Sequence, residues 1–188
     1  MKRSLLLLLI FGWTSQLSAR TDSLQFRQNY IDAKYNVLRS THVTYFTGGD
    51  ISWGKDLNSY LSMKLGVEYA HCPFHNDNGW NLYSLNFIPV YITTDFHLCQ
   101  LHQIQPFIQI SQGISFNSYL KTDQQHQWPS YWVKERGYYV YLAVGSKIRI
   151  TKKISFLLLC GFKGYRMSFN VLDVNPHGFT VSTGIEFI

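Results

Sequence analysis

An alternation of apolar and polar residues with a period of two, repeated in segment after segment, most restricts what this chain can fold into. Residues 61–70 read Leu-Met-Leu-Val-Tyr on one face and Ser-Lys-Gly-Glu-Ala on the other. Residues 138–151 and 179–187 divide as cleanly, and residues 106–119 keep the pattern with one interruption at Gln112. Side chains of a β-strand point alternately to opposite faces of its sheet. The chain is therefore predicted to be all-β.

The strand count and the connections indicate a barrel. Less regular segments at 42–54, 82–96 and 154–168 bring the count to seven, and an eighth strand is expected within residues 24–39, where the alternation is indecisive. Short connections at 55–59 and 152–153 and an intermediate one at 97–105 alternate with longer ones at 72–81, 121–136 and 170–177. Bacterial outer-membrane barrels combine short periplasmic turns with longer external loops. We predict an eight-stranded antiparallel up-and-down transmembrane β-barrel.

The first residues predict export. Lys2 and Arg3 precede the apolar run Leu5–Trp13, and a short polar stretch leads to Ala19. This order is typical of a secretory signal peptide, and nine apolar residues are too few to cross ~30 Å of hydrocarbon as a helix. No later segment approaches 18 uninterrupted apolar residues, which excludes a helical membrane protein. The expected division is a signal peptide at 1–19 and an outer-membrane barrel domain at 20–188.

Composition favours a membrane-facing surface. Only 15% of the residues are charged while 16% are aromatic, whereas soluble domains carry about 25% charged residues. The basic residues are scattered, so no nucleic-acid partner is expected. The polar face also carries glycines, which would relieve crowding in a narrow lumen: Gly48, Gly66, Gly113, Gly145, Gly161 and Gly184. A secreted soluble barrel with its apolar face inward and a small apolar ligand stays open as an alternative.

The charges of the polar face have mixed sign. They are Asp50, Lys64, Glu68, Lys147, Arg149, Lys163 and Glu186. Charges in a narrow lumen are tolerable when they pair and hydrogen-bond, whereas an ion pathway requires rings of one sign. The sequence therefore predicts a plugged polar lumen and not an open channel.

Four segments carry a family resemblance: LGVEY at 65–69, IPVYITTDF at 88–96, QPFIQISQGISF at 105–116 and GIEFI at 184–188. With them the chain resembles the small Bacteroidota-type outer-membrane β-barrel proteins, an eight-stranded, opacity-protein-like porin family, over roughly residues 35–188. The resemblance implies residence in the outer membrane and insertion by the barrel assembly machinery. The chain ends Phe187-Ile188, a departure from the terminal Phe common in such barrels.

Metal and cysteine chemistry receive no assigned site. Two sets of residues have ligand types and spacing that zinc uses. The first, at the start of the predicted loop 72–81, is His71, Cys72 and His75, and the second is His97, Cys99 and His102. Each set is better explained as solvated polar residues of a loop or turn, so neither a metal nor a cofactor is predicted. Cys72, Cys99 and Cys160 are expected in an outer loop, a periplasmic turn and mid-strand, too far apart to form a disulfide.

Catalytic and docking residues are likewise weighed without assigning a site. A lipid-A-modifying enzyme would need a nucleophile, a histidine and a carboxylate together at the outer rim, yet Ser182 and Glu186 run inward and down the strand from His177. The predicted loop 121–136 combines cations with Trp128, Pro129, Tyr131 and Trp132. These aromatics suit a partner or the phosphates of lipopolysaccharide, but packing over the barrel mouth is favoured. The expected role is non-enzymatic: structural, adhesive or recognition-related, among outer-membrane lipid and lipopolysaccharide, with no protein partner identifiable.

Overall fold

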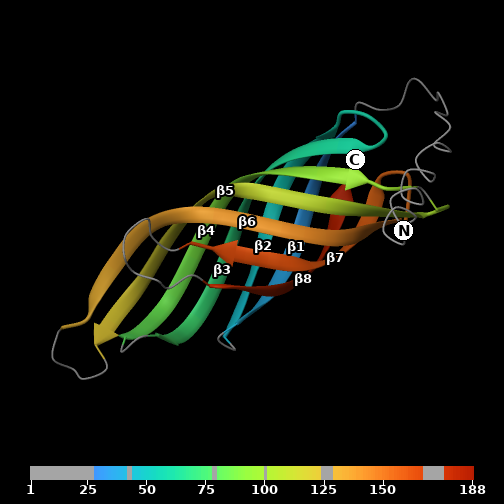
Figure 1. Ribbon diagram of the computed structural model, residues 1–188. Helices are drawn as coiled ribbons and strands as arrows, with labels where there is room; N and C mark the ends of the chain where they lie inside the picture. Colours follow the sequence, from blue (N-terminus) through green and yellow to red (C-terminus); the bar gives the residue numbers. More distant parts are fainter. Residues whose placement is uncertain (1–27, 42–43, 78–79, 100, 124–128, 167–175) are drawn as a thin grey trace, which may run out of the picture.

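Eight β-strands make up the described part of the chain. The computed structural model describes residues 28–41, 44–77, 80–99, 101–123, 129–166 and 176–188, so the predicted signal peptide at 1–19 lies outside it. The strands are β1 Asn29–Ser40, β2 Tyr45–Asp56, β3 Leu61–Asp77, β4 Trp80–His97, β5 Ile104–Asp123, β6 Tyr131–Arg149, β7 Ile154–Tyr165 and β8 His177–Phe187 (Figure 1). Among these residues no helix is long and apolar enough to cross a membrane.

The strands form one closed antiparallel barrel in chain order. Each pairs with its neighbours in the sequence, and β1 closes the ring by pairing with β8. A row of paired residues that starts at Tyr30 passes through all eight strands and returns to β1 at Ser40, ten residues further on. Such a stagger tilts the strands by roughly 35–45° from the barrel axis. Along such a row of paired residues, each step to the next strand therefore moves along the barrel axis by the rise of a little more than one residue.

The apolar face points outward, which confirms the predicted orientation. Val140 and Leu142 on β6 are each 56% exposed, and Val181 and Ile185 on β8 are exposed as well. The polar residues between them line the interior. Exposed apolar side chains of all eight strands form a belt around the barrel. Soluble monomeric proteins rarely expose so large a continuous apolar surface to water. The soluble-barrel alternative, which required these side chains in an enclosed core, is excluded.

Glycines on the inner face make room for large aromatic side chains. A Cβ atom added to Gly66 would lie 2.6 Å from the ring of Tyr91, and one added to Gly54 would lie 2.5 Å from the ring of Tyr30. Distances this short do not occur between unbonded carbon atoms, so neither position tolerates a side chain without displacing the ring. The predicted relief of crowding in the lumen is confirmed at Gly66, and Gly54 plays the same part although it was not among the predicted glycines.

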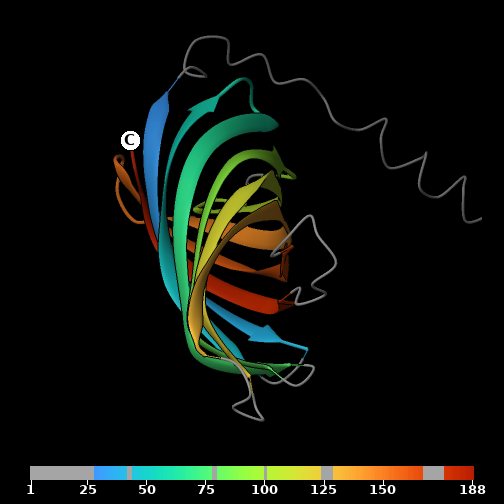
Figure 2. The same ribbon diagram turned by 90° about the vertical axis from the view of Figure 1, so that its left-hand side faces the viewer.

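Two predicted outer loops are mostly strand. Residues 72–77 belong to β3 and 80–81 to β4, while 121–123 and 131–136 extend β5 and β6. Strands β3 to β6 have 17 to 20 residues, against 11 or 12 in the other four, and in Figures 1 and 2 they continue as a curved wall past the ends of their neighbours. The loop prediction was wrong because polar and turn-forming residues can remain in a sheet when neighbouring strands continue to pair.

A β-bulge lies where these long strands leave the belt. The pairing of β4 with β5 shifts between Tyr83 and Asn86, and Ser84 has a φ of 50°. The inward face of β3 changes parity at the same level, from Cys72 to His75. A bulge inserts an extra residue and bends its strand. This bend begins the outer extension, which we define as residues 72–77, 80–86, 118–123 and 131–136.

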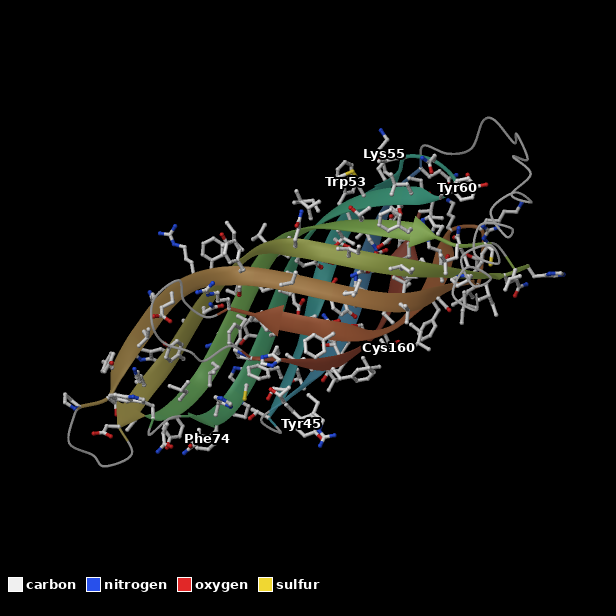
Figure 3. The ribbon with its side chains drawn as sticks, viewed as in Figure 1. Tyr45, Trp53, Lys55, Tyr60, Phe74 and Cys160 are labelled. Atoms are coloured by element: carbon white, nitrogen blue, oxygen red, sulfur yellow. The ribbon has the colours of Figure 1, made fainter. Side chains whose placement is uncertain are left out.

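The three cysteines are free, as predicted, although one position differs. Cys72 is buried on the inner face of β3 and not in a loop, because β3 continues to Asp77. Cys99 is exposed just after β4, and Cys160 is exposed on the outer face of β7 (Figure 3). Of the predicted loop 170–177, residues 170–175 lie outside the described part, and His177 begins β8.

Candidate functional site: the filled lumen and the outer extension

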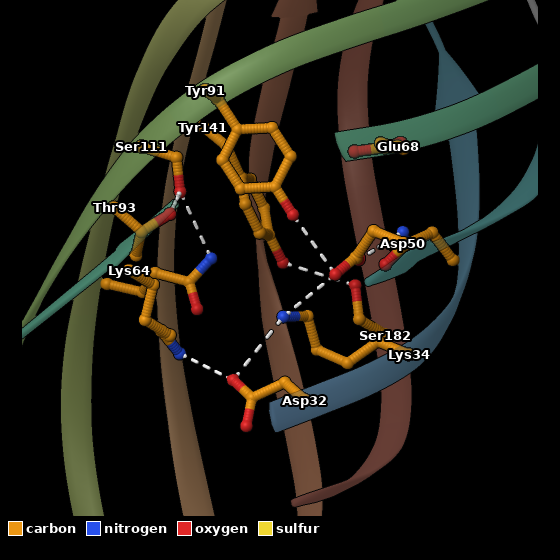
Figure 4. A network of polar contacts seen from close by, with 12 residues as sticks. Asp32, Lys34, Asp50, Lys64, Glu68, Tyr91, Thr93, Ser111, Tyr141 and Ser182 are labelled. Atoms are coloured by element: carbon orange, nitrogen blue, oxygen red, sulfur yellow. Dashed lines mark hydrogen bonds and ion pairs between the residues drawn. The ribbon is translucent and has the colours of Figure 1, made fainter. Parts of the chain in front are cut away.

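Five charged side chains from four strands form a continuous ionic network in the lower lumen. The Lys34 ammonium lies 3.0 Å from the Asp50 carboxylate and 3.8 Å from that of Asp32. The Lys64 ammonium lies 2.8 Å from Asp32 and 2.6 Å from Asp95. All five are buried, and Figure 4 shows this chain of contacts around Asp32, Lys34 and Asp50. Alternating charges at these distances compensate for the loss of water in the interior.

A second ionic group lies higher in the lumen, around Glu68. Lys163 donates to both of its carboxylate oxygens, at 2.8 and 2.9 Å. Hydroxyl donors complete the group, with Tyr139 at 2.9 Å and Tyr165 at 2.7 Å. Glu68 is 2% exposed and Lys163 1%, so the pair is sealed from solvent. Because these contacts join β3 to β6 and β7 across the lumen, they connect opposite walls of the barrel.

The predicted lumen charges lie inside with one exception. Lys147 pairs with Glu186 at 2.7 Å near the end of the barrel where the chain enters β1 and leaves β8. Arg149, predicted inside, is exposed, because it is the last residue of β6 at the end of the barrel. The sequence interpretation missed Asp32, Lys34 and Asp95. The first two alternate with the outward-facing Ile31, Ala33 and Tyr35. This signal is present in the sequence but could not be used while β1 was unplaced.

Apolar and aromatic side chains close the lumen above the ionic groups. Phe87 contacts Phe46, with ring centroids 5.5 Å apart, and Tyr165, at 4.9 Å. The fully buried side chains here also include Leu38, Leu82 and Leu85. Charged and apolar layers together occupy the lumen along its length. The interior is suited to hold the barrel rigid and poorly suited to conduct ions.

The outer extension has its own polar contacts on its inner face. The Lys121 ammonium lies 4.0 Å from the centroid of the Trp80 ring, and the Tyr119 hydroxyl donates to Glu135 at 3.0 Å. Burial lowers the pKa of Lys121, and burial together with the Glu135 carboxylate raises the pKa of Tyr119. These contacts place Lys121 inside the curved wall, contrary to its assignment to an exposed loop. Trp132 points outward and is 60% exposed.

The residues weighed as zinc ligands do not converge. The Cys72 thiol contacts the carbonyl of Phe74, His75 Nδ1 lies 2.9 Å from the Thr44 hydroxyl, and His71 Nδ1 lies 3.0 Å from the Asn86 amide oxygen. In the second set His97 is buried, whereas Cys99 and His102 are exposed. Across the residues that the structure describes, no three His, Cys, Asp or Glu side chains are grouped to hold a metal ion.

The residues weighed for catalysis are likewise separated. Ser182 contacts the Tyr141 hydroxyl at 3.3 Å, and Glu186 pairs with Lys147. His177 contacts Thr41 at 3.4 Å.

A serine–histidine contact that the sequence did not reveal joins Ser62 to His97 Nε2 at 3.0 Å. His97 Nδ1 is buried and has no hydrogen-bond partner among the described atoms. A catalytic histidine needs an orienting group at that nitrogen, and Ser62 is fully buried besides. This contact belongs to the packing of the lumen.

A closed barrel with an apolar outer wall and an ion-paired interior is a transmembrane β-barrel. No protein-family model and no curated protein sequence matches the chain.

Solved structures share its fold. They include a major outer membrane protein from Thermus thermophilus (TM-score 0.58, 10% identity, 85% of this chain and 99% of that one). Neisserial surface protein A has a TM-score of 0.55 with 10% identity, covering 87% and 97%. The N-terminal barrel domain of Pseudomonas aeruginosa OprF has a TM-score of 0.54 with 14% identity, covering 86% and 99%. The fold is thus that of the small outer-membrane barrels, and the narrower Bacteroidota-type resemblance stays a prediction.

Proposed function

We propose that this chain is an integral protein of the bacterial outer membrane that works through its outer wall and outer extension, without catalysis. Its role is structural, adhesive or recognition-related. Its surroundings are outer-membrane lipid and lipopolysaccharide, and the barrel assembly machinery inserts it. The filled lumen supports this proposal most directly, since it leaves the outer surfaces as the parts through which the protein meets other molecules.

Short distances between opposite charges support a lumen that is closed to ions. Each of the four lysines that the structure describes in the ionic groups of the lumen, below the outer extension, has a carboxylate within 3.0 Å: Lys34, Lys64, Lys147 and Lys163. A permeating ion would have to replace these contacts and then displace the aromatic layer around Phe87. Selective pores instead expose rings of one sign to water. We therefore expect no ion pathway through the barrel.

Conductance and fractionation test the proposal. Purified protein in planar bilayers should give no discrete conductance steps, and the protein in cells should fractionate with the outer membrane and show heat-modifiable gel mobility. Steps of uniform size would contradict the filled lumen. Recovery in the soluble periplasmic fraction would overturn the membrane assignment itself.

The non-enzymatic part is tested separately. Lipid A from cells that lack the gene should have the same mass spectrum as lipid A from cells that express it. Loss of one acyl or headgroup modification, restored by the wild-type gene but not by Ser62→Ala, would instead identify an enzyme and assign a catalytic role to the buried serine–histidine contact.

A further inference from the structure

We propose that two copies of this chain associate in the membrane through the wall of β4, β5 and β6, with reciprocal hydrogen bonds between the carboxamides of their Gln112 side chains. The inference goes beyond the proposed function but rests on the residence in the outer membrane that it assigns. The partner is a second copy of the chain, and the contact lies within the lipid-facing belt.

Gln112 lies on the outward face of β5 in the middle of the apolar belt. It is exposed, and it pairs in register with Ile92 on β4 and Val140 on β6. Along β5 the belt continues for two outward residues on either side, Ile108 and Ile110 toward the β4–β5 turn and Ile114 and Phe116 toward the outer extension. Four residues on a strand tilted by roughly 40° put about 10 Å of hydrocarbon on each side of the carboxamide. This exceeds the reach of a glutamine side chain, so Gln112 cannot extend to water.

The carboxamide has no hydrogen-bond partner in its own chain among the residues that the structure describes. Six of its outward neighbours are exposed aliphatic side chains: Val90, Ile92, Ile110, Ile114, Val140 and Leu142. An amide in hydrocarbon without a hydrogen-bond partner is costly. Polar groups at this depth are accordingly rare in membrane proteins and mark functional contacts.

Gln112 belongs to a column of side chains with hydrogen-bonding groups, one on each strand of this wall: Thr94, Gln112 and Tyr138. Thr94 lies two residues from Ile92 toward the β4–β5 turn, and Tyr138 lies two residues from Val140 toward the outer extension. Each step of the column moves about 5 Å across to the next strand and about 7 Å along it. This direction makes an angle of roughly 35–40° with the strands, which matches their tilt in size and sense. The column therefore runs parallel to the barrel axis.

A second copy complements this column. A two-fold axis along the membrane normal, placed beside the column, brings each of its side chains against the same side chain of the other copy. A carboxamide has a donor and an acceptor side by side, so two Gln112 side chains exchange two hydrogen bonds across the axis. Acyl chains offer neither group. Both copies keep the same orientation in the membrane under this symmetry, as insertion requires.

The strand tilt keeps the contact small. Under this symmetry the two β5 strands cross at twice the tilt, roughly 80°, so the walls touch only around the column. Lipid packs against aliphatic side chains about as well as protein does, so apolar contact gives little net driving force in a membrane. The paired carboxamides therefore decide both the affinity and the register of the dimer.

Förster resonance energy transfer in phospholipid vesicles tests the association. Donor and acceptor maleimides are attached to the exposed Cys99 in a Cys160→Ala background, and energy transfer should fall with lipid dilution along a monomer–dimer curve. Gln112→Leu should weaken the dimer about tenfold, the effect of losing two hydrogen bonds in a membrane. The control Tyr35→Phe removes a hydroxyl group from the belt on β1, four strands away, and should leave the dimer unchanged. Gln112→Leu stabilises the diluted monomer, so its loss of dimer is not misfolding.

A steric pair of variants locates the interface. Thr94→Trp places a large ring on the column and should abolish energy transfer, whereas Thr183→Trp places it on the outward face of β8, on the opposite wall, and should not. Dimerisation unaffected by Gln112→Leu or by Thr94→Trp would overturn the proposal. Energy transfer no higher than random mixing at every dilution would do the same and leave lipid as the cover of Gln112. Heat-modifiable mobility is checked first: a folded barrel that stays monomeric refutes only this inference, whereas a chain that never inserts refutes the proposed function as well.

Discussion

Removal of Lys163 isolates the contribution of the ionic groups in the lumen. Lys163→Met keeps the length of the side chain but leaves the Glu68 carboxylate with two tyrosine hydroxyls and no cation within hydrogen-bond distance. Loss of one partner of a buried ion pair costs about 3–5 kcal/mol. Because both hydroxyls remain, we expect the lower end, ~3 kcal/mol, or roughly a hundredfold in the unfolding equilibrium.

Urea unfolding in phospholipid vesicles, followed by tryptophan fluorescence and gel mobility, measures this loss. The double variant Glu68→Gln/Lys163→Met removes both charges and should recover most of the stability, because no uncompensated charge stays buried. Lys152→Met, in an exposed turn, is the control and should stay within about 0.5 kcal/mol of wild type. A Lys163→Met protein as stable as this control, or a double variant no better than the single one, would refute the ion-pair argument.

Three other expectations concern packing and exposure. Gly66→Val should destabilise the barrel by about 1–3 kcal/mol, because its Cβ would collide with the Tyr91 ring, and the same urea titration measures the loss. Gln112 faces lipid between apolar neighbours, so Gln112→Leu should raise stability by about 1 kcal/mol, and an unchanged or lower midpoint would contradict its placement. In vesicles, a water-soluble maleimide should modify Cys99 but not Cys160, as read by peptide mass spectrometry, and equal labelling would place β7 outside the bilayer.

The sequence predicted the parts of the fold that depend on local alternation. Residues 61–70 and 179–187 have the expected parity, and with it the assignment of Val181 outward and Glu68 inward. The indecisive segment 24–39 holds all of β1 except its last residue, Ser40. The outward residues Ile31, Ala33 and Tyr35 alternate regularly in space, but their hydrophobicity gives only a weak pattern. Parity is a property of each strand alone, which is why it could be read without coordinates.

Features that depend on neighbouring strands could not be predicted in this way. The polar segment after Cys72 remains in β3 because β4 continues beside it, and the shift at Ser84 leaves no pattern in a single strand. The partners of each lumen charge are also non-local, as for Glu68 and Lys163, which are 95 residues apart in the chain. Sequence could say that these charges must pair, but only the register and stagger of the closed barrel decide which ones do.

The contact between Glu68 and Lys163 also restricts how the chain can enter a bilayer. A hairpin of β3 and β4 carries Lys64, Glu68 and Asp95 on one face. Lys64 and Asp95 pair within the hairpin, but Glu68 pairs with Lys163 of β7, and hydrocarbon offers it no other partner. Only the nearly complete ring brings β7 opposite β3. Entry of one hairpin at a time would therefore leave the Glu68 charge unpaired in hydrocarbon, so this contact favours insertion of the strands as a nearly closed ring.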